Sequence, residues 1–257
     1  MMVYSQTEEN YLKAIYKLSK LQPKGVSTKS IGDVLDIKSP TVSDMLKKLS
    51  DKNLIKYARY KGVALTKEGE IIALKIIRKH RLWETFLVEK FKFKWDEVHA
   101  IAEQLEHINS PELVNRLDEY LDFPQFDPHG DPIPDKNGKI IQKFEKTLDK
   151  VASGNEVVMV GVKDHSPKFL KYIESLRLNL GEKISVVNII DYDKSYVIKT
   201  VDESEKIISH QVCKNIIVRS TPLSTDSVFN LSFIHFVNCL SLPHISSLTL
   251  FFINQVA

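Results

Sequence analysis

The chain has 257 residues, of which 43% are hydrophobic and 27% charged, and its formal net charge is +3. Such a composition is ordinary for a soluble globular protein of two or three small domains, and it excludes a fibrous or largely disordered chain. Two cysteines are too few for a disulfide framework, and the N-terminus lacks the basic and apolar regions of a signal peptide. We therefore expect a cytoplasmic protein with no membrane partner.

The charges are distributed unevenly along the chain. Residues 1–79 contain 16 Lys and Arg against 8 Asp and Glu, whereas residues 80–150 contain 10 against 15. A basic segment suits a polyanion such as a nucleic acid, and an acidic segment suits cations. The distribution favours a polyanion-binding first third followed by a cation-binding middle third.

The first 66 residues have the pattern of a winged helix-turn-helix. An apolar-periodic helix follows Thr7, the expected N-cap, which has Asn10 three residues on. Ser27 caps a second helix, and a third begins at Ser39 and Pro40, where the missing N–H of proline costs nothing. Two short β-rich runs, 55–60 and 63–66, then form a hairpin that is the expected wing.

The outer face of the third helix is the expected DNA-reading surface. Small hydroxyl and polar residues at its start are expected in the major groove, and basic residues are expected on phosphates. The groove residues are Ser39, Pro40, Thr41, Ser43 and Asp44, and the phosphate residues are Lys47, Lys48, Arg59 and Lys61. The alternative for the hairpin tip is a solvated basic turn without a ligand.

Metal-competent side chains recur at helical spacing in the middle third. A long helix expected from Thr66 to about Phe91 carries His80 and Glu84 at i and i+4. The run from His99 to His107 places four such side chains within a roughly 100° arc of one helix: His99, Glu103, Glu106 and His107. His99 and His107 are about 12 Å apart along that axis, so two metal positions, or one position and a bystander, are implied.

Imidazole nitrogen and carboxylate oxygen without a thiolate suit manganese or ferrous iron. The alternative is that these residues decorate a solvated helix face.

The last part of the chain alternates short β-rich runs with one helix at 167–176. This pattern predicts a small antiparallel barrel of about 75 residues. Residues 221–257 follow with one charged residue, Asp226, and polar residues interrupt every window long enough to span a bilayer. We expect an atypical tail with no assigned role.

Together these segments resemble the diphtheria-toxin-repressor family of iron- and manganese-dependent transcriptional regulators. The resemblance covers roughly residues 5–220 and rests on the segments 7–16, 39–43, 79–82, 98–99, 106–107 and 126–134. It implies a mainly α N-terminal half and a small β-rich, SH3-like C-terminal domain similar to the ferrous-transport accessory protein. The expected domains are a winged helix at 1–72, a helical metal-binding and dimerisation domain at 73–143, the SH3-like domain at 144–220 and the tail at 221–257.

The resemblance also implies ligand roles. His80, Glu84 and His99 match an ancillary metal site, and Glu103, Glu106 and His107 match a primary one. Asn10 stands where a Met or Asp ligand is usual, and Lys13 stands where members with a two-ion cluster carry a carboxylate, which argues against that cluster. Glu103 stands where iron-type members have a cysteine, and oxygen in place of sulfur favours manganese.

Three further residues match places of interest in the family. Asp164 and His165 lie near the position from which some relatives reach the ancillary metal, but a polar loop before a helix also explains both. His129, in the proline-rich loop 124–134, is expected to be structural.

The expected function is a metal-dependent DNA-binding regulator, and a repressor of metal-uptake genes. Its partners are a palindromic double-stranded operator and a second copy of the chain, joined through the long helix near Trp83, with two manganese or ferrous sites per subunit. The alternatives are a winged-helix regulator of a non-metal signal and a metal-dependent hydrolase. No enzyme is expected, because Arg81 follows His80 and Ala100 follows His99, so neither histidine begins a His-Glu-x-x-His signature.

Overall fold

The computed structural model describes residues 4–58, 62–141, 146–202 and 204–220. Arg59 and Lys61 of the expected wing tip, the expected domain boundary at 143–144 and the expected tail at 221–257 lie outside these residues.

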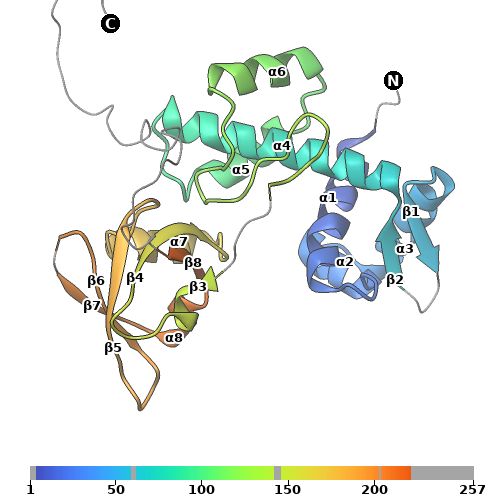
Figure 1. Cartoon of the computed structure of the whole chain (residues 1–257). Helices are drawn as coiled ribbons and strands as arrows, with labels where there is room; N and C mark the ends of the chain where they lie inside the picture. Colours follow the sequence, from blue (N-terminus) through green and yellow to red (C-terminus); the bar gives the residue numbers. More distant parts are fainter. Residues whose placement is uncertain (1–3, 59–61, 142–145, 203, 221–257) are drawn as a thin grey trace, which may run out of the picture. The chain divides into compact units, whose positions relative to one another are not determined.

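Three helices and a hairpin form the N-terminal part (Figure 1). They are α1 (Gln6–Leu21), α2 (Thr28–Leu35), α3 (Ser39–Asp51), β1 (Ile55–Ala58) and β2 (Gly62–Leu65). The two strands pair antiparallel, with Ile55 opposite Leu65. Apolar residues at helical spacing, among them Leu12, Ile15 and Leu46, are fully buried in one core. The predicted winged helix-turn-helix is confirmed.

Two helices begin differently from the prediction. The N-cap of α1 is Ser5 rather than Thr7: the Ser5 hydroxyl accepts from the Glu8 N–H, and the Ser5 N–H donates to the Glu8 carboxylate. This reciprocal pair needs a Glu or Gln three residues after the cap, which Ser5 has and Thr7 lacks. Ser39 is the first residue of α3 instead of its cap, and the cap residue Lys38 makes no side-chain hydrogen bond there.

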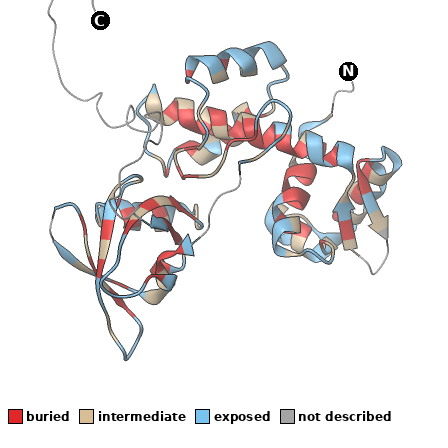
Figure 2. Cartoon of the chain, viewed as in Figure 1, coloured by how far each residue is buried: buried red, intermediate tan, exposed pale blue. Residues whose placement is uncertain are grey.

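The long helix α4 (Lys67–Glu89) takes part in two cores. Its first half contributes Ala73, Leu74 and Ile77 to the winged-helix core. Its second half contributes Leu82 to a smaller cluster that includes Leu117 of α6 (Pro111–Tyr120). Figure 2 shows buried residues along α4, whereas most of α6 is exposed. One continuous helix therefore joins the winged-helix fold to the second domain, and α5 (Val98–Leu105) packs beside it.

A loop at 126–134 lies against strand β4 (Glu156–Val162) and requires a glycine. Gly130 has φ +80°, and a Cβ added there would lie 2.1 Å from the Val160 carbonyl oxygen. The Val162 N–H donates to the His129 carbonyl at 3.0 Å. Because glycine has no side chain, the backbone at position 130 can approach the strand closely, and this approach holds His129 in place.

The C-terminal domain is a six-stranded antiparallel sheet in the order β3-β8-β4-β5-β6-β7. Besides β4, its elements are β3 (Lys146–Thr147), η1 (Leu148–Lys150), α7 (Pro167–Ser175), β5 (Lys183–Ile189), β6 (Tyr196–Lys199), β7 (Glu205–Ile208), α8 (His210–Cys213) and β8 (Ile216–Ser220). Register shifts in β4 and β5 let the sheet bend around its core. The predicted β-rich domain is confirmed, with α8, η1 and β3 as elements that the sequence pattern did not reveal.

None of the helices in the described ranges is long and apolar enough to cross a membrane.

The winged-helix core gives a matched test of burial within α1. Leu12 is fully buried and Leu21, in the same helix, is 79% exposed. We expect Leu12→Ala to destabilise the N-terminal part by about 2–5 kcal/mol, because it removes buried methyl groups and leaves a cavity. Leu21→Ala should change stability by about 0.5 kcal/mol at most. Thermal unfolding followed by circular dichroism measures both, and equal melting temperatures for the two variants would contradict this packing.

Candidate metal centre

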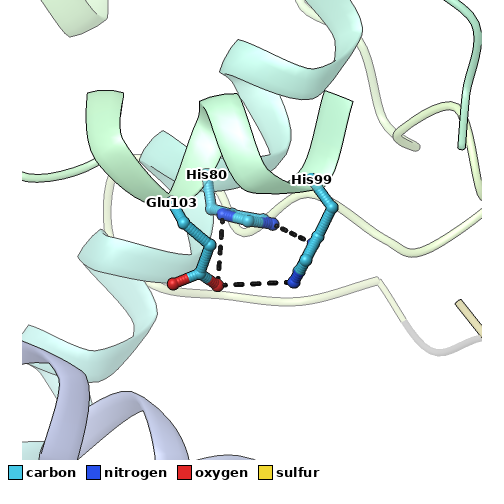
Figure 3. A group of neighbouring side chains, drawn as sticks. All are labelled: His80, His99 and Glu103. Carbon is cyan, nitrogen blue, oxygen red and sulfur yellow. Dashed lines mark hydrogen bonds and ion pairs between the residues drawn. The ribbon is translucent and has the colours of Figure 1, made fainter. Parts of the chain in front are cut away.

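The predicted ligands converge between α4 and α5. His80 and Glu84 lie one turn apart on α4, and His99 and Glu103 lie one turn apart on α5. Figure 3 shows His80, His99 and Glu103 pointing toward one another, and their ligand atoms all lie within 4.8 Å of one another. The spacing of i and i+4 on each of two packed helices is therefore sufficient to gather four metal-competent side chains.

The end of α5 departs from the expected single stripe. The helix ends at Leu105, Glu106 is its C-cap, and His107 lies beyond it. The His107 ring turns toward α1, where its Nδ1 lies 2.5 Å from Glu9 Oε2. Its Nε2 faces Glu106, 3.7 Å from Oε1. A carboxylate on one ring nitrogen fixes the tautomer and leaves the other free to serve as a metal donor. Glu9 is a residue that helical spacing in the middle third could not reveal.

His80 connects the two predicted ligand sets. Its Nδ1 lies 2.6 Å from Glu106 Oε2, and its Nε2 lies 3.0 Å from Glu84 Oε1. His99 Nδ1 is 3.1 Å from both His80 Nε2 and Glu84 Oε1. The ancillary and primary sets are thus neighbours within one network.

Buried contacts shift the pKa values of the residues in this network. Burial lowers the pKa of His80, but hydrogen bonds to Glu106 and Glu84 outweigh burial, so the pKa is raised overall. Burial raises the pKa of Glu84, but the neighbouring His129 ring and hydrogen bonds from His80 and His99 hold it well below its usual value. Glu84 is therefore an ionised carboxylate with 3% of its side chain exposed, a state that suits a metal ligand.

Lys13 of α1 enters the same network. Its Nζ lies 2.7 Å from Glu103 Oε1 and 2.5 Å from Glu106 Oε1. Lys13 and Glu106 have 7% and 0% of their side chains exposed. The ammonium therefore joins the first helix of the winged helix to α5 across a buried ion pair.

The donor set fits a divalent ion. Asn10 Oδ1 is buried and has no hydrogen-bond partner among the described residues, which is costly for an amide oxygen unless something binds it. It lies on α1, one turn before Lys13. Oxygen and imidazole donors without a cysteine suit manganese or ferrous iron. The predicted histidines and carboxylates thus gather as one connected network, and Asn10 lies on α1, the helix that carries Lys13.

A second group of ligand atoms was not predicted. Glu84, Asp127 and His129 are all buried and have ligand atoms within 4.8 Å of one another. Burial and the nearby carboxylates of Asp131 and Glu84 raise the pKa of Asp127 to about 6. Burial lowers the pKa of His129, but Glu84 outweighs it and the pKa is raised to about 9. The feature of the sequence that could have indicated this group is the spacing of Asp127 and His129 in a rigid loop.

Within the described part of the chain, His129 makes a hydrogen bond through only one ring nitrogen. Its Nε2 donates to the Trp95 carbonyl at 2.8 Å. Its Nδ1 is buried without a hydrogen bond, 3.7 Å from Glu84 Oε2. The His165 ring stacks on it with centroids 4.9 Å apart. Asp164, by contrast, accepts from the Ser166 N–H at the start of α7, as a polar loop residue does.

The predicted DNA-reading residues lie on the exposed side of α3, except that Ser43 is half-buried. The Ser43 hydroxyl donates to the Ser39 carbonyl, and Lys47 pairs with Asp44, at 3.4 Å with both side chains exposed. Lys48 and Lys52, near the end of α3, lie 3.3 Å and 2.6 Å from the buried Glu8 carboxylate. The side chains of Lys47 and Lys48 remain 69% and 57% exposed.

Comparison with known protein families matches three consecutive segments of the chain. Residues 3–63 match the iron dependent repressor N-terminal DNA binding domain. Residues 66–135 match the iron dependent repressor metal binding and dimerisation domain, and residues 146–220 match the FeoA domain.

Individual relatives agree with these matches. The chain is 37% identical over 130 residues to the iron-dependent repressor IdeR of Mycobacterium tuberculosis, which covers 50% of this chain and 55% of the relative. It is 33% identical over 128 residues to the diphtheria toxin repressor of Corynebacterium glutamicum, covering 50% and 56%. These alignments span about half the length of the curated relatives.

Solved structures match over a longer stretch. A manganese-dependent transcriptional repressor in complex with manganese is 31% identical, with a TM-score of 0.74, and the match covers 83% of this chain and all of that one. ScaR with bound Cd2+ is 30% identical, with a TM-score of 0.68, covering 83% and 99%.

Manganese should stabilise this fold. An ion that binds only the folded state at 100 times its dissociation constant adds about 2.7 kcal/mol to the free energy of unfolding. We expect Mn2+ to raise the melting temperature, and a chelator to reverse the rise. Glu106→Gln should lose most of the rise, because Glu106 lies at the centre of the network. Glu112→Gln, on the exposed face of α6, is the matched control and should behave as the unmodified protein. An equal manganese response in both variants would exclude Glu106 as a ligand.

Proposed function

This chain belongs to the iron-dependent repressor family of metal-dependent, DNA-binding transcriptional regulators, and on that premise we propose that it is a manganese- or ferrous-iron-activated repressor of metal-uptake genes. The observation that carries the proposal is the buried network of histidines and carboxylates, which joins α1 of the winged helix to α4 and α5. A regulator of this kind acts in the cytoplasm and performs no catalytic step.

We assign the ligands to two neighbouring positions. Asn10, Glu103, Glu106 and His107 hold the primary ion, with Asn10 supported by its unpartnered buried oxygen. His80, Glu84 and His99 hold the ancillary ion, and Asp127 and His129 extend that set through Glu84. A bound divalent ion supplies positive charge that neutralises these carboxylates. Asn10 and Glu9 then fix the first turns of α1 against His107 and Glu106, and thereby the angle of the winged helix.

The DNA-facing part of the proposal assigns roles on α3 and the wing. Ser39, Pro40, Thr41, Ser43 and Asp44 read base edges, and Lys47, Lys48, Arg59 and Lys61 hold phosphates. A single winged helix reads only a short half-site. We therefore propose a homodimer on a palindromic operator, with half-sites one or more helical turns apart.

Exposed aromatic residues near α6 support the dimer. Phe91 and Tyr120 are 62% and 63% exposed, and both rings lie against Phe86 of α4, at centroid distances of 5.0 Å and 6.1 Å. Trp83 packs on the same ring at 5.7 Å. A connected aromatic surface of this kind is typical of a protein–protein interface.

Two other functions receive less support. A winged helix that senses a non-metal signal leaves the buried Asn10 oxygen and the converging carboxylates without a purpose. A hydrolase needs an activated nucleophile or water beside its ligands. Solved relatives of this chain include manganese-dependent transcriptional repressors, which favours regulation.

Removal of His107 tests the switch. We expect His107→Ala to abolish the manganese-dependent gain in DNA affinity without unfolding, because the primary ion loses its imidazole and α1 loses the Glu9 contact. His99→Ala, in the ancillary set, should weaken the gain less. Fluorescence anisotropy measures it, on a palindromic duplex selected from a random library in the presence of Mn2+. His210→Ala, in α8 outside both groups, is the control. An unchanged manganese midpoint for His107→Ala would refute the switch.

Removal of a phosphate contact has a different signature. Lys47→Ala should weaken binding to all sequences alike and flatten the salt dependence of the binding constant by about one unit. Lys168→Ala, on an exposed position of α7, should leave the slope unchanged. The measurement is the duplex dissociation constant across a series of salt concentrations with Mn2+ held fixed. The same slope for both variants would remove Lys47 from the interface.

A further inference from the structure

The buried ammonium of Lys13 occupies the carboxylate oxygens that a metal ion needs. Its Nζ lies within hydrogen-bond distance of Oε1 of both Glu103 and Glu106, and only 7% of its side chain is exposed. These carboxylates are two of the ligands assigned to the primary ion. A cation that binds these two carboxylate oxygens must therefore displace the Lys13 ammonium or share the oxygens with it.

Charge explains why the ammonium is there. Two carboxylates this close repel each other, and burial makes an uncompensated charge costly. One ammonium balances one of the two negative charges, and His80 contacts the far oxygen of Glu106 at 2.6 Å. The carboxylates are thus held close together.

We propose that Lys13 is a built-in competitor, an internal cation that holds Glu103 and Glu106 when no divalent ion is bound and so sets the metal concentration at which the primary position fills. The inference rests on the proposed function, because it takes these carboxylates as metal ligands.

The competition also selects by charge. A monovalent ion that replaced the ammonium would exchange one positive charge for another and gain little. A divalent ion brings twice the charge to the same two oxygens. Lys13 therefore favours divalent over monovalent cations at a position lined by carboxylates, where sodium or potassium would otherwise bind.

The competition acts on the contact between domains. Lys13 is on α1, and its partners Glu103 and Glu106 lie one turn apart at the end of α5. The ammonium therefore links the winged helix to the metal-binding domain before any ion binds. Asn10, one turn earlier on α1, is the proposed ligand on that helix. Metal binding thus replaces the link between α1 and α5 through Lys13 with a link through Asn10.

The test measures affinity directly. Lys13→Met keeps the length of the side chain and removes its charge, and it should tighten Mn2+ binding about tenfold or more in isothermal titration calorimetry. Lys13→Arg keeps the charge and should tighten binding less than Lys13→Met. Lys20→Met, at the exposed end of α1, is the matched control and should bind as the unmodified protein does. Without metal, Lys13→Met should melt at a lower temperature, because its carboxylates are uncompensated.

The outcomes separate the two proposals. If the unmodified protein binds no Mn2+, the proposed function fails. If it binds Mn2+ but folded Lys13→Met binds equally or more weakly, only the competitor role of Lys13 is overturned. If Lys13→Met does not fold, Lys13→Gln replaces it in the same titration and its Mn2+ affinity is judged in the same way. The glutamine amide still donates to the carboxylates without carrying charge.

Discussion

Buried carboxylates that must be neutralised are the constraint on which the rest of this structure depends. Glu84 and Glu106 have almost no exposed side-chain surface, and isolated charges at such positions would destabilise the fold by several kcal/mol each. His80, between them on α4, contacts both, and Lys13 reaches Glu106 from α1. Cationic groups from different helices are thus drawn to one place. The same need for positive charge that packs the helices together makes the centre a candidate site for divalent ions.

The arrangement separates two electrostatic tasks along one helix. The basic N-terminal part presents Lys47 and Lys48 to solvent, whereas Glu84 and Glu106 of the second domain are buried. The continuous helix α4 carries core residues of both parts, so displacement of one part relative to the other strains packed side chains. The network at the α1–α4–α5 junction is therefore placed where small differences in charge balance have the most effect on domain geometry.

Helical periodicity made part of the centre predictable. His80 and Glu84, like His99 and Glu103, lie at i and i+4, and the structure gathers them as that spacing requires. The end of α5 at Leu105 was not predictable, because no glycine or proline marks it. The roles of Glu9 and Lys13 were missed for a different reason. Their partners are separated from them by 90 residues or more, and only tertiary packing brings them together. His129 likewise depends on the approach of its loop to β4, which a glycine at 130 permits.

The capping carboxylate of α1 has a consequence for the mechanics of that helix. Glu8 closes the first turn through Ser5 and also holds Lys48 and Lys52 of α3, while the next residue, Glu9, holds His107. Adjacent residues on a helix point about 100° apart, so these two carboxylates contact different neighbouring helices or segments. A rotation of α1 about its own axis would break both sets of contacts together. These contacts therefore oppose rotation of α1, and a displacement that preserves them must move α1 as a rigid unit together with the end of α3.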